Sequence, residues 1–480
     1  MATTNIDGPG ETRTERTFAM RLLTILLAGF AMMIGAVTPA HAQLKVDVVG
    51  ERYIPLRIAI PDFDATGPGA AEAAAQMVQV IRQDLSGSAV FQVMDKNAFI
   101  EKNLDISLQP RFPDWTVIDA QGLVVGNVVV DANNNMTVQF RLYDVFRGAQ
   151  QFATQYTVPT PLNWRRLAHK VADDIYSQLT GDPPYFDSRV VFVAQSAYTD
   201  QEGRPAIRKR LAIMDQDGAN AEFLLSGMNL VNKPRFSPST QTIIFTAWVP
   251  NPRNPKETLL RTYLYDIETG RQELLSEARN SMDFSARFSP DGRSVAMTRE
   301  ANGNSDIYIV ELARRSDRRL TNWPGIETAP SFSPDGQQIV FQSDQGGSSQ
   351  LYTMRTDGGD MACPTGGGRE RACRITFGQG RYDEPVWSPR GDWIAFTRQS
   401  GGRWGIGIIR PDGTGEKMLT DSFQDEGPTW APNGRVIAFA REAGRGAGPK
   451  LWTIDITGLN ERRMPTPGDA THPAWSPILK

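Results

Sequence analysis

The sequence has 480 residues, of which 40% are hydrophobic and 22% are charged, with a formal net charge of −3 at pH 7. Its length exceeds what one core usually organises, so two domains, or a repeat domain beside another, are expected. The charge is nearly balanced and no block of Lys or Arg is interleaved with aromatic residues, which argues against a nucleic-acid-binding surface.

Residues 1–42 have the features of a cleavable signal peptide. A basic residue precedes an apolar run from Leu22 to Ala36, and Ala40-His41-Ala42 supplies the small residues that signal peptidase requires. The run is shorter than the ~20 apolar residues that span a membrane. A start at Met20 would give a signal peptide of normal length. We therefore expect an exported mature chain without a membrane span.

The mature chain would begin with a short segment, residues 43–55, that lies outside the obvious core. Apolar and polar residues alternate along it: Gln43, Leu44, Lys45, Val46, Asp47, Val48 and Val49. It reads either as an edge strand or frayed terminus of the next domain, or as a detachable strand that adds to the sheet of a partner.

Residues 56–180 alternate strand and helix patterns and predict a compact α/β domain. The strands are expected at 56–60, 91–94, 123–130, 137–143 and 152–158, and the helices at 70–85 and 164–179. Gly181-Asp182-Pro183-Pro184 is a stiff break and marks a domain boundary.

Residues 185–480 contain six copies of one pattern, Pro-x-aromatic-Ser/Ala-Pro-x-Gly, with variations. Their aromatic residues lie roughly 43 to 55 positions apart, the length of a four-stranded propeller blade, at Phe236, Phe288, Phe332, Trp387, Trp430 and Trp475. The aromatic side chain can fill the space between blades, and Pro-Asp-Gly favours a turn. The repeat predicts an all-β six-bladed β-propeller.

The two ends of the repeat array complement each other. Residues 189–193 resemble a second strand with no motif before it, and residues 473–477 resemble a first strand with nothing after it. Pairing of Trp475's strand with Val190's would close the ring and remove the open edge. Deletion of the last eight residues is therefore expected to unfold the ring.

Cys363 and Cys373 are the only cysteines, and they flank a Gly-rich stretch. In an exported protein this pair favours a disulfide that closes a surface loop. Zinc is the weaker interpretation, because His169 and His472 are the only histidines of the mature chain. We expect no metal site and no cofactor.

The loops that enter the first strand of each blade converge at the mouth of the central channel and form the expected binding surface. Acidic groups outnumber basic ones there, which would attract a basic loop or a cation, and Met282, Phe284 and Tyr382 could anchor a partner. The alternative is that these residues cap strands or solvate the rim. The predicted contact residues are Lys233, Met282, Asp283, Phe284, Ser285, Glu327, Thr328, Tyr382, Asp383, Glu384, Asp425, Glu426, Thr471 and His472.

Enzymatic activity is not expected. No Gly-x-Ser-x-Gly motif occurs, and the two histidines of the mature chain, far apart in the sequence, give little support for a Ser/His/Asp triad. A propeller that binds or processes a small peptide or sugar remains the alternative to a protein-binding scaffold.

The signal peptide, the α/β domain, the six repeats and the terminal Pro-Ala-Trp-Ser-Pro-Ile-Leu together resemble the TolB family over essentially the whole mature chain. Peptidases of the prolyl oligopeptidase type share the repeat, but no catalytic domain is expected after the last strand. The departures are Ser239-Thr240 in place of Asp-Gly, Ala286 in place of Pro, and the Cys-bearing insertion.

The resemblance implies a periplasmic component of the Tol-Pal system, which supports outer-membrane integrity and membrane constriction during cell division. It implies that a propeller face binds the peptidoglycan-associated lipoprotein Pal, and that Gln43 to Val49 bind TolA. Outside such a complex we expect a monomer.

Overall fold

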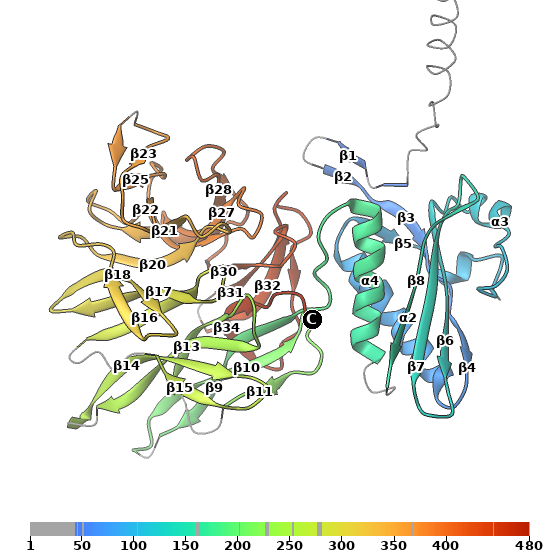
Figure 1. Ribbon diagram of the computed structural model, residues 1–480, viewed down its shortest axis with the longest axis horizontal. Helices are drawn as coiled ribbons and strands as arrows, with labels where there is room; N and C mark the ends of the chain where they lie inside the picture. The colour runs from blue at the N-terminus through green and yellow to red at the C-terminus, as the bar shows by residue number, and fades with distance from the viewer. Residues whose placement is uncertain are drawn as a thin grey trace, which may run out of the picture. The chain divides into compact units, whose positions relative to one another are not determined.

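The computed structural model describes residues 44–45, 47–49, 52–102, 104–159, 164–200, 202–225, 230–251, 254–275, 281–366, 368–444 and 446–479. The predicted signal peptide, Gln43 and Val46 lie outside these residues. An α/β region, in which helices accompany a sheet, comes first in the chain, and a six-bladed β-propeller follows it (Figure 1). No helix in the described part of the chain is long and apolar enough to cross a membrane.

The N-terminal sheet is mixed, with the order β5-β3-β6-β7-β8 and with β4 paired to β6. β3 runs parallel to β5 and β6, whereas β6, β7 and β8 form antiparallel pairs. The strands are β3 (Leu56–Ala59), β4 (Asp64–Thr66), β5 (Phe91–Val93), β6 (Gly122–Val130), β7 (Met136–Asp144) and β8 (Ala149–Val158).

Two long helices, α2 (Ala70–Gly87) and α4 (Trp164–Thr180), pack against each other and the sheet. Both bury an apolar stripe at helical spacing, including Met77 and Ile81 in α2 and Val171 and Ile175 in α4. These elements match the predicted strands and helices to within a few residues. β4, the short helix η1 (Lys96–Ala98) and α3 (Phe112–Thr116) were not anticipated.

The propeller has six four-stranded antiparallel sheets, coloured from green to red along the chain in Figure 1. Blade 2 consists of β12 (Val231–Phe236), β13 (Thr242–Asn251), β14 (Asn254–Asp266) and β15 (Gln272–Leu274). Blade 3 consists of β16 (Met282–Phe288), β17 (Ser294–Ala301), β18 (Asn304–Glu311) and β19 (Ser316–Arg319). Blade 4 consists of β20 (Glu327–Phe332), β21 (Gln338–Ser343), β22 (Gln350–Arg355) and β25 (Ala372–Arg374). Blade 5 consists of β26 (Arg381–Trp387), β27 (Ile394–Ser400), β28 (Arg403–Ile409) and β29 (Lys417–Met418). Blade 6 consists of β30 (Gln424–Trp430), β31 (Val436–Glu442), β32 (Lys450–Asp455) and β33 (Arg462–Arg463).

Blade 1 joins the two ends of the propeller sequence. Its strand order is β11 (Glu222–Phe223), β10 (Pro205–Asp215), β9 (Arg189–Thr199) and β34 (Asp469–Trp475). Trp475 pairs with Val190 and Ala474 with Val191 in the β34–β9 register. The predicted closure of the ring by the C-terminal strand is therefore confirmed.

The motif aromatics pack between neighbouring blades, as their chemistry predicts. Trp387 of β26 lies in one apolar cluster with Val340 and Leu351 of the preceding blade. Trp430 likewise packs with Val386 and Ile406 of blade 5. Each blade therefore supplies part of its neighbour's core, so the stability of one blade depends on the next.

The cysteine pair forms the predicted disulfide, with a Cα–Cα distance of 5.3 Å between Cys363 and Cys373. It closes an insertion between β22 and β25 that contains the small hairpin β23 (Met361–Ala362) and β24 (Arg369–Glu370). Loop-closure entropy for so short a loop gives about 2.5 to 3 kcal/mol at most, enough to hold the insertion but not the propeller.

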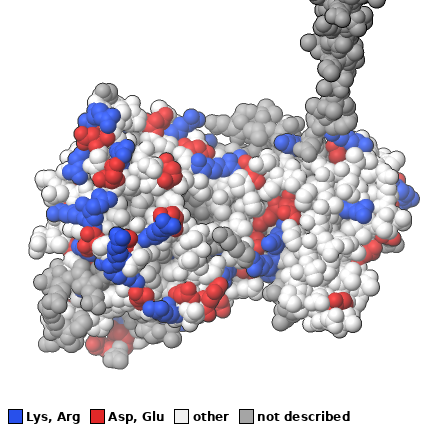
Figure 2. Space-filling model, in the orientation of Figure 1, with Lys and Arg blue, Asp and Glu red and all other residues white. Residues whose placement is uncertain are grey.

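Charges of opposite sign lie beside each other on the propeller face shown in Figure 2. Ion pairs of the propeller include Arg315 with Glu273, and Arg314 with Glu311 at 3.4 Å. Because positive and negative groups are interspersed there, the part of the face drawn in colour does not present the single-sign field that attracts a polyanion.

Candidate binding face of the propeller

The first strand of every blade carries a β-bulge at the same repeat position. The backbone there has a positive φ, between 48° and 66°, at Lys233, Ser285, Ala329, Glu384, Gly427 and His472. Register shifts in all six first-strand pairings lie at this point. A bulge re-aims a side chain, and here the six bulge residues form one ring partway along the first strands. We call the end of the channel where the first strands begin the upstream mouth.

An ion pair crosses the channel at this ring. Lys233 Nζ of blade 2 lies 2.8 Å from Glu384 Oε1 of blade 5, and it also donates to Ser285 Oγ at 3.3 Å. Burial alone would raise the pKa of Glu384, but the charge and hydrogen bond of Lys233, together with His472 and Arg235, lower it to about 2. Burial lowers the pKa of His472 to about 4, so this imidazole is neutral at pH 7. The predicted residues Lys233, Ser285, Glu384 and His472 therefore meet in one ring.

Two residues before each bulge, the side chain is buried inside its blade. These residues are Val231, Asp283, Glu327, Tyr382, Asp425 and Ala470. Arg299 Nε lies 2.9 Å from Asp283 Oδ1, Arg441 Nε lies 2.7 Å from Asp425 Oδ1, and the Tyr382 hydroxyl donates to Glu416 Oε1 at 2.7 Å. Four predicted contact residues, Asp283, Glu327, Tyr382 and Asp425, are thus engaged within the blades.

Glu327 occupies the same repeat position as Asp283 and Asp425, but a serine faces it where they face an arginine. Ser343 Oγ donates to Glu327 Oε1 at 2.8 Å, while the buried Oε2 has no hydrogen-bond partner among the described residues. Burial raises the pKa of this carboxyl to about 7, because the hydrogen bond from Ser343 and the charge of Arg319 offset only part of the effect.

The raised pKa makes the charge of Glu327 destabilising at neutral pH. Between its ordinary value of 4.5 and about 7, the unfolded chain loses the proton and the folded one keeps it, so the free energy of unfolding falls as pH rises. The loss amounts to at most about 3 kcal/mol. Urea unfolding should show that Glu327→Gln gains stability relative to wild type from pH 5 to pH 8. The exposed Glu268→Gln is the control, and an equal change in both variants would contradict the assignment.

The other predicted residues lie nearer the surface of the upstream mouth. Met282, Phe284, Thr328, Asp383 and Glu426 are half-buried, and Thr471 is buried. Glu426 and Thr471 line a cavity of about 380 Å³ between blades 6 and 1. This cavity is part of the same face.

Large apolar side chains are exposed where the chain enters the first strands. Leu230 is 42%, Ile326 46% and Phe423 41% exposed, and Phe377, in the loop before β26, is 59% exposed. Phe377 and Phe423 were not among the predicted contacts, although an apolar residue in a polar inter-strand loop is a signal that could have identified them. Exposed apolar side chains around a polar ring are typical of a protein-binding surface.

The mature N-terminal segment forms a separate hairpin. β1 (Asp47–Val49) pairs antiparallel with β2 (Arg52–Ile54) in a two-stranded sheet of its own, so within the described residues β1 does not join the α/β sheet. This arrangement differs from the edge-strand interpretation.

His169 is buried on α4 and has its polar partner nearby. Its Nδ1 lies 2.6 Å from Asp84 Oδ2, and Gln216 Nε2 donates to Asp84 Oδ1 at 2.8 Å. Asp84, His169 and Asp217 form a cluster of residue types that can bind a metal ion, and Asp217 forms an ion pair with Arg165. These contacts explain the cluster as a structural network.

Comparisons with known proteins agree with this architecture. Residues 44–151 match the model of the TolB amino-terminal domain, and residues 176–479 match that of the TolB beta propeller domain. The chain is 42% identical over 470 residues to the Tol-Pal system protein TolB of Gluconobacter oxydans, covering 96% of this chain and 94% of the relative. It is 46% identical over 448 residues to that of Dinoroseobacter shibae, covering 92% and 95%.

A solved structure supports the same assignment. The crystal structure of TolB from Acinetobacter baumannii is 27% identical, with a TM-score of 0.73, and the match covers 91% of this chain and all of that one. The matches to these relatives span both halves of the chain. The chain belongs to the TolB family.

Proposed function

We propose that this protein is a periplasmic, protein-binding scaffold of the Tol-Pal system that links Pal to TolA, in support of outer-membrane integrity and membrane invagination during cell division. The relatives named Tol-Pal system protein TolB span nearly all of the chain and support this role. We propose no catalytic step for it. The observation that carries the proposal is the upstream mouth, where exposed apolar groups surround the ring of bulge residues.

Pal binds at this mouth in our proposal. Ile326, Phe377 and Phe423 would supply the apolar anchors that dominate the affinity of protein interfaces. Lys233 and Glu384 offer charges that orient a polar loop but already pair with each other. A mainly apolar rim with a neutralised centre suits a protein surface better than a small sugar, which requires several free polar groups.

Binding of the soluble Pal domain to the mature chain tests this proposal. Replacing Ile326 and Phe423 together by alanine should weaken binding at least about tenfold, because anchor truncations cost about 2 kcal/mol or more each. Phe223, 52% exposed on β11, the outermost strand of blade 1, provides the matched control Phe223→Ala. No binding by wild type, or an equal loss in the control, would contradict the proposed face. Saturable binding of a peptide or sugar instead of Pal would support the alternative.

TolA binds the segment Gln43–Val49 in our proposal. β1 pairs only with β2 in the described part of the chain, so its other edge can accept a strand from a partner. Removing residues 43–49 should abolish TolA binding in a calorimetric titration and leave Pal binding within about twofold. Equal loss of both partners would indicate misfolding and refute a separate site.

A further inference from the structure

The other end of the channel, at the Pro-x-Gly turns, has a different character. A cavity of about 440 Å³ opens there, and we call it the turn-side cavity. It is lined by the residues two positions after each bulge, Arg235, Arg287, Ser331, Val386, Thr429 and Ala474, and by the motif aromatics and prolines that follow them. One repeat position thus faces the channel in all six blades, and neighbouring blades 2 and 3 place arginine at it.

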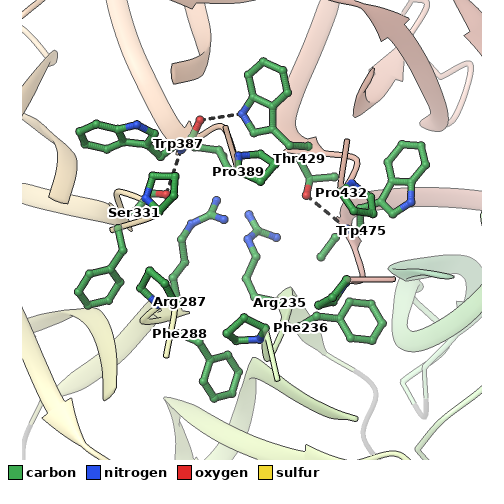
Figure 3. Close-up of a pocket in the computed structure, with 18 of the residues that line it drawn as sticks. Arg235, Phe236, Arg287, Phe288, Ser331, Trp387, Pro389, Thr429, Pro432 and Trp475 are labelled. Carbon is green, nitrogen blue, oxygen red and sulfur yellow. Dashed lines mark hydrogen bonds between the residues drawn. The ribbon is translucent and has the colours of Figure 1, made fainter. Parts of the chain in front are cut away.

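The two arginines project together into the centre of this cavity (Figure 3). Arg235 is only 8% exposed, and its Nη1 donates to the carbonyl of Pro234 at 2.6 Å. Among the described residues, no carboxylate lies within 4.0 Å of either guanidinium, and Arg287 has no hydrogen-bond partner for its side chain. Buried arginine normally has a carboxylate or another anion beside it.

The surrounding charges compensate these cations only in part, since Glu384 acts on both guanidinium groups but is shared with Lys233. Lys233, Arg235, Arg287 and Glu384 are the charged groups of the turn-side cavity and of the small pocket behind it, which makes three cations and one anion. Glu384 is already paired with Lys233 at 2.8 Å. Burial lowers the pKa of Arg287 well below its usual range, and the charge of Arg235 lowers it further. A buried surplus of positive charge is costly unless an anion joins it.

Two hydroxyl groups complete a set of donors at the same level. Ser331 Oγ accepts from Trp387 N at 3.1 Å, and Thr429 Oγ1 accepts from Trp475 N at 3.3 Å. Because each oxygen already accepts from a backbone N–H, its own hydrogen remains to donate into the cavity. Two guanidinium groups and two hydroxyl groups match the acceptors of an oxyanion.

We propose that the turn-side cavity binds a small oxyanion, of phosphate or carboxylate type, on the guanidinium groups of Arg235 and Arg287. The site lies beyond the Lys233–Glu384 pair from the upstream mouth, so it is separate from the proposed Pal contact. Bound anion would join blades 2 and 3 to the opposite wall of the channel and stabilise the folded ring.

Thermal unfolding of the mature chain tests the site. Sodium phosphate and sodium succinate are titrated separately, with sodium chloride at matched ionic strength as reference. We expect a saturable rise of Tm with at least one of the two oxyanions, and the anion that acts at the lower concentration identifies the phosphate or carboxylate type. No rise beyond the chloride reference for either anion would overturn the proposal.

Arg287→Gln separates an anion site from a purely structural arginine. In chloride buffer the variant should unfold at a higher temperature than wild type, because it removes an uncompensated buried charge, while its affinity for the oxyanion in calorimetry falls at least about tenfold. The exposed Arg293→Gln in the same blade removes the same charge and should keep the wild-type affinity. A lower Tm of Arg287→Gln in chloride, or unchanged affinity, would overturn the assignment.

Discussion

Removal of the last eight residues, Pro473 to Lys480, is expected to abolish the cooperative unfolding transition of the propeller. The deletion takes away the C-terminal end of the pairing of β34 with β9, Ala474 opposite Val191 and Trp475 opposite Val190. It also removes the hydrogen bond from Trp475 Nε1 to Ser188 Oγ at 2.8 Å. The edge of β9 would be open beside Val190 and Val191, and the space that Trp475 fills between blades 6 and 1 would be empty. Because each blade packs on the next, this loss affects the whole ring.

Circular dichroism and limited proteolysis of the truncated mature chain would measure this effect. The matched control removes only Leu479 and Lys480, which lie beyond β34. Leu479 N donates to the Asp187 carbonyl at 2.9 Å, so this shorter deletion should cost about 1 kcal/mol. A truncated chain that keeps a native spectrum, protease resistance and Pal binding would show that the ring does not depend on its closing strand.

The repeat and the closure of the ring can be predicted from the sequence, because turn residues and the alternation of apolar and polar residues in strands depend on residues close together in the chain. Gly292, Gly336, Gly391 and Gly434 adopt the positive φ that the Pro-x-Gly turn requires. The motif aromatics likewise need only a mid-strand position to reach the neighbouring blade. The same locality explains why the main helices and strands of the α/β sheet were predicted closely, whereas the short β4, η1 and α3 were not.

The bulge was not predictable, and it decides which side chains reach the channel. A residue before proline disfavours helical conformations, yet Lys233, Glu384 and His472 precede proline with φ near 50°. If the bulge is ignored, the strict alternation of side chains along a strand assigns the residues before the bulge to the wrong face of the blade. This is why the interpretation of the rim combined buried acids with ring residues and overlooked Arg235 and Arg287 as neighbours.

Asp425→Ala should destabilise the protein by about 3 kcal/mol, because the largely buried Arg441 loses its two-pronged partner and keeps only the more exposed Glu461. Both nitrogens of the fork, Nε and Nη2, lie 2.7 Å from the two oxygens of Asp425. If Asp425 were a rim contact, as the sequence alone suggested, the same variant would weaken Pal binding and leave stability unchanged. Urea unfolding and Pal titration of one preparation therefore distinguish the two roles.

Two further variants show whether the cost comes from the weakened pairing of Arg441. Asp421 pairs with Arg403 at 3.1 Å, but both side chains are exposed, so Asp421→Ala should cost no more than about 1 kcal/mol. The double variant Asp425→Ala, Arg441→Met removes the buried charge and should recover much of the lost stability, since Met can still pack against Trp452, over which the guanidinium now lies at 4.8 Å. If the double variant were as unstable as the sum of its single changes, the pair would act independently. The carboxylate would then stabilise the blade by some route other than Arg441.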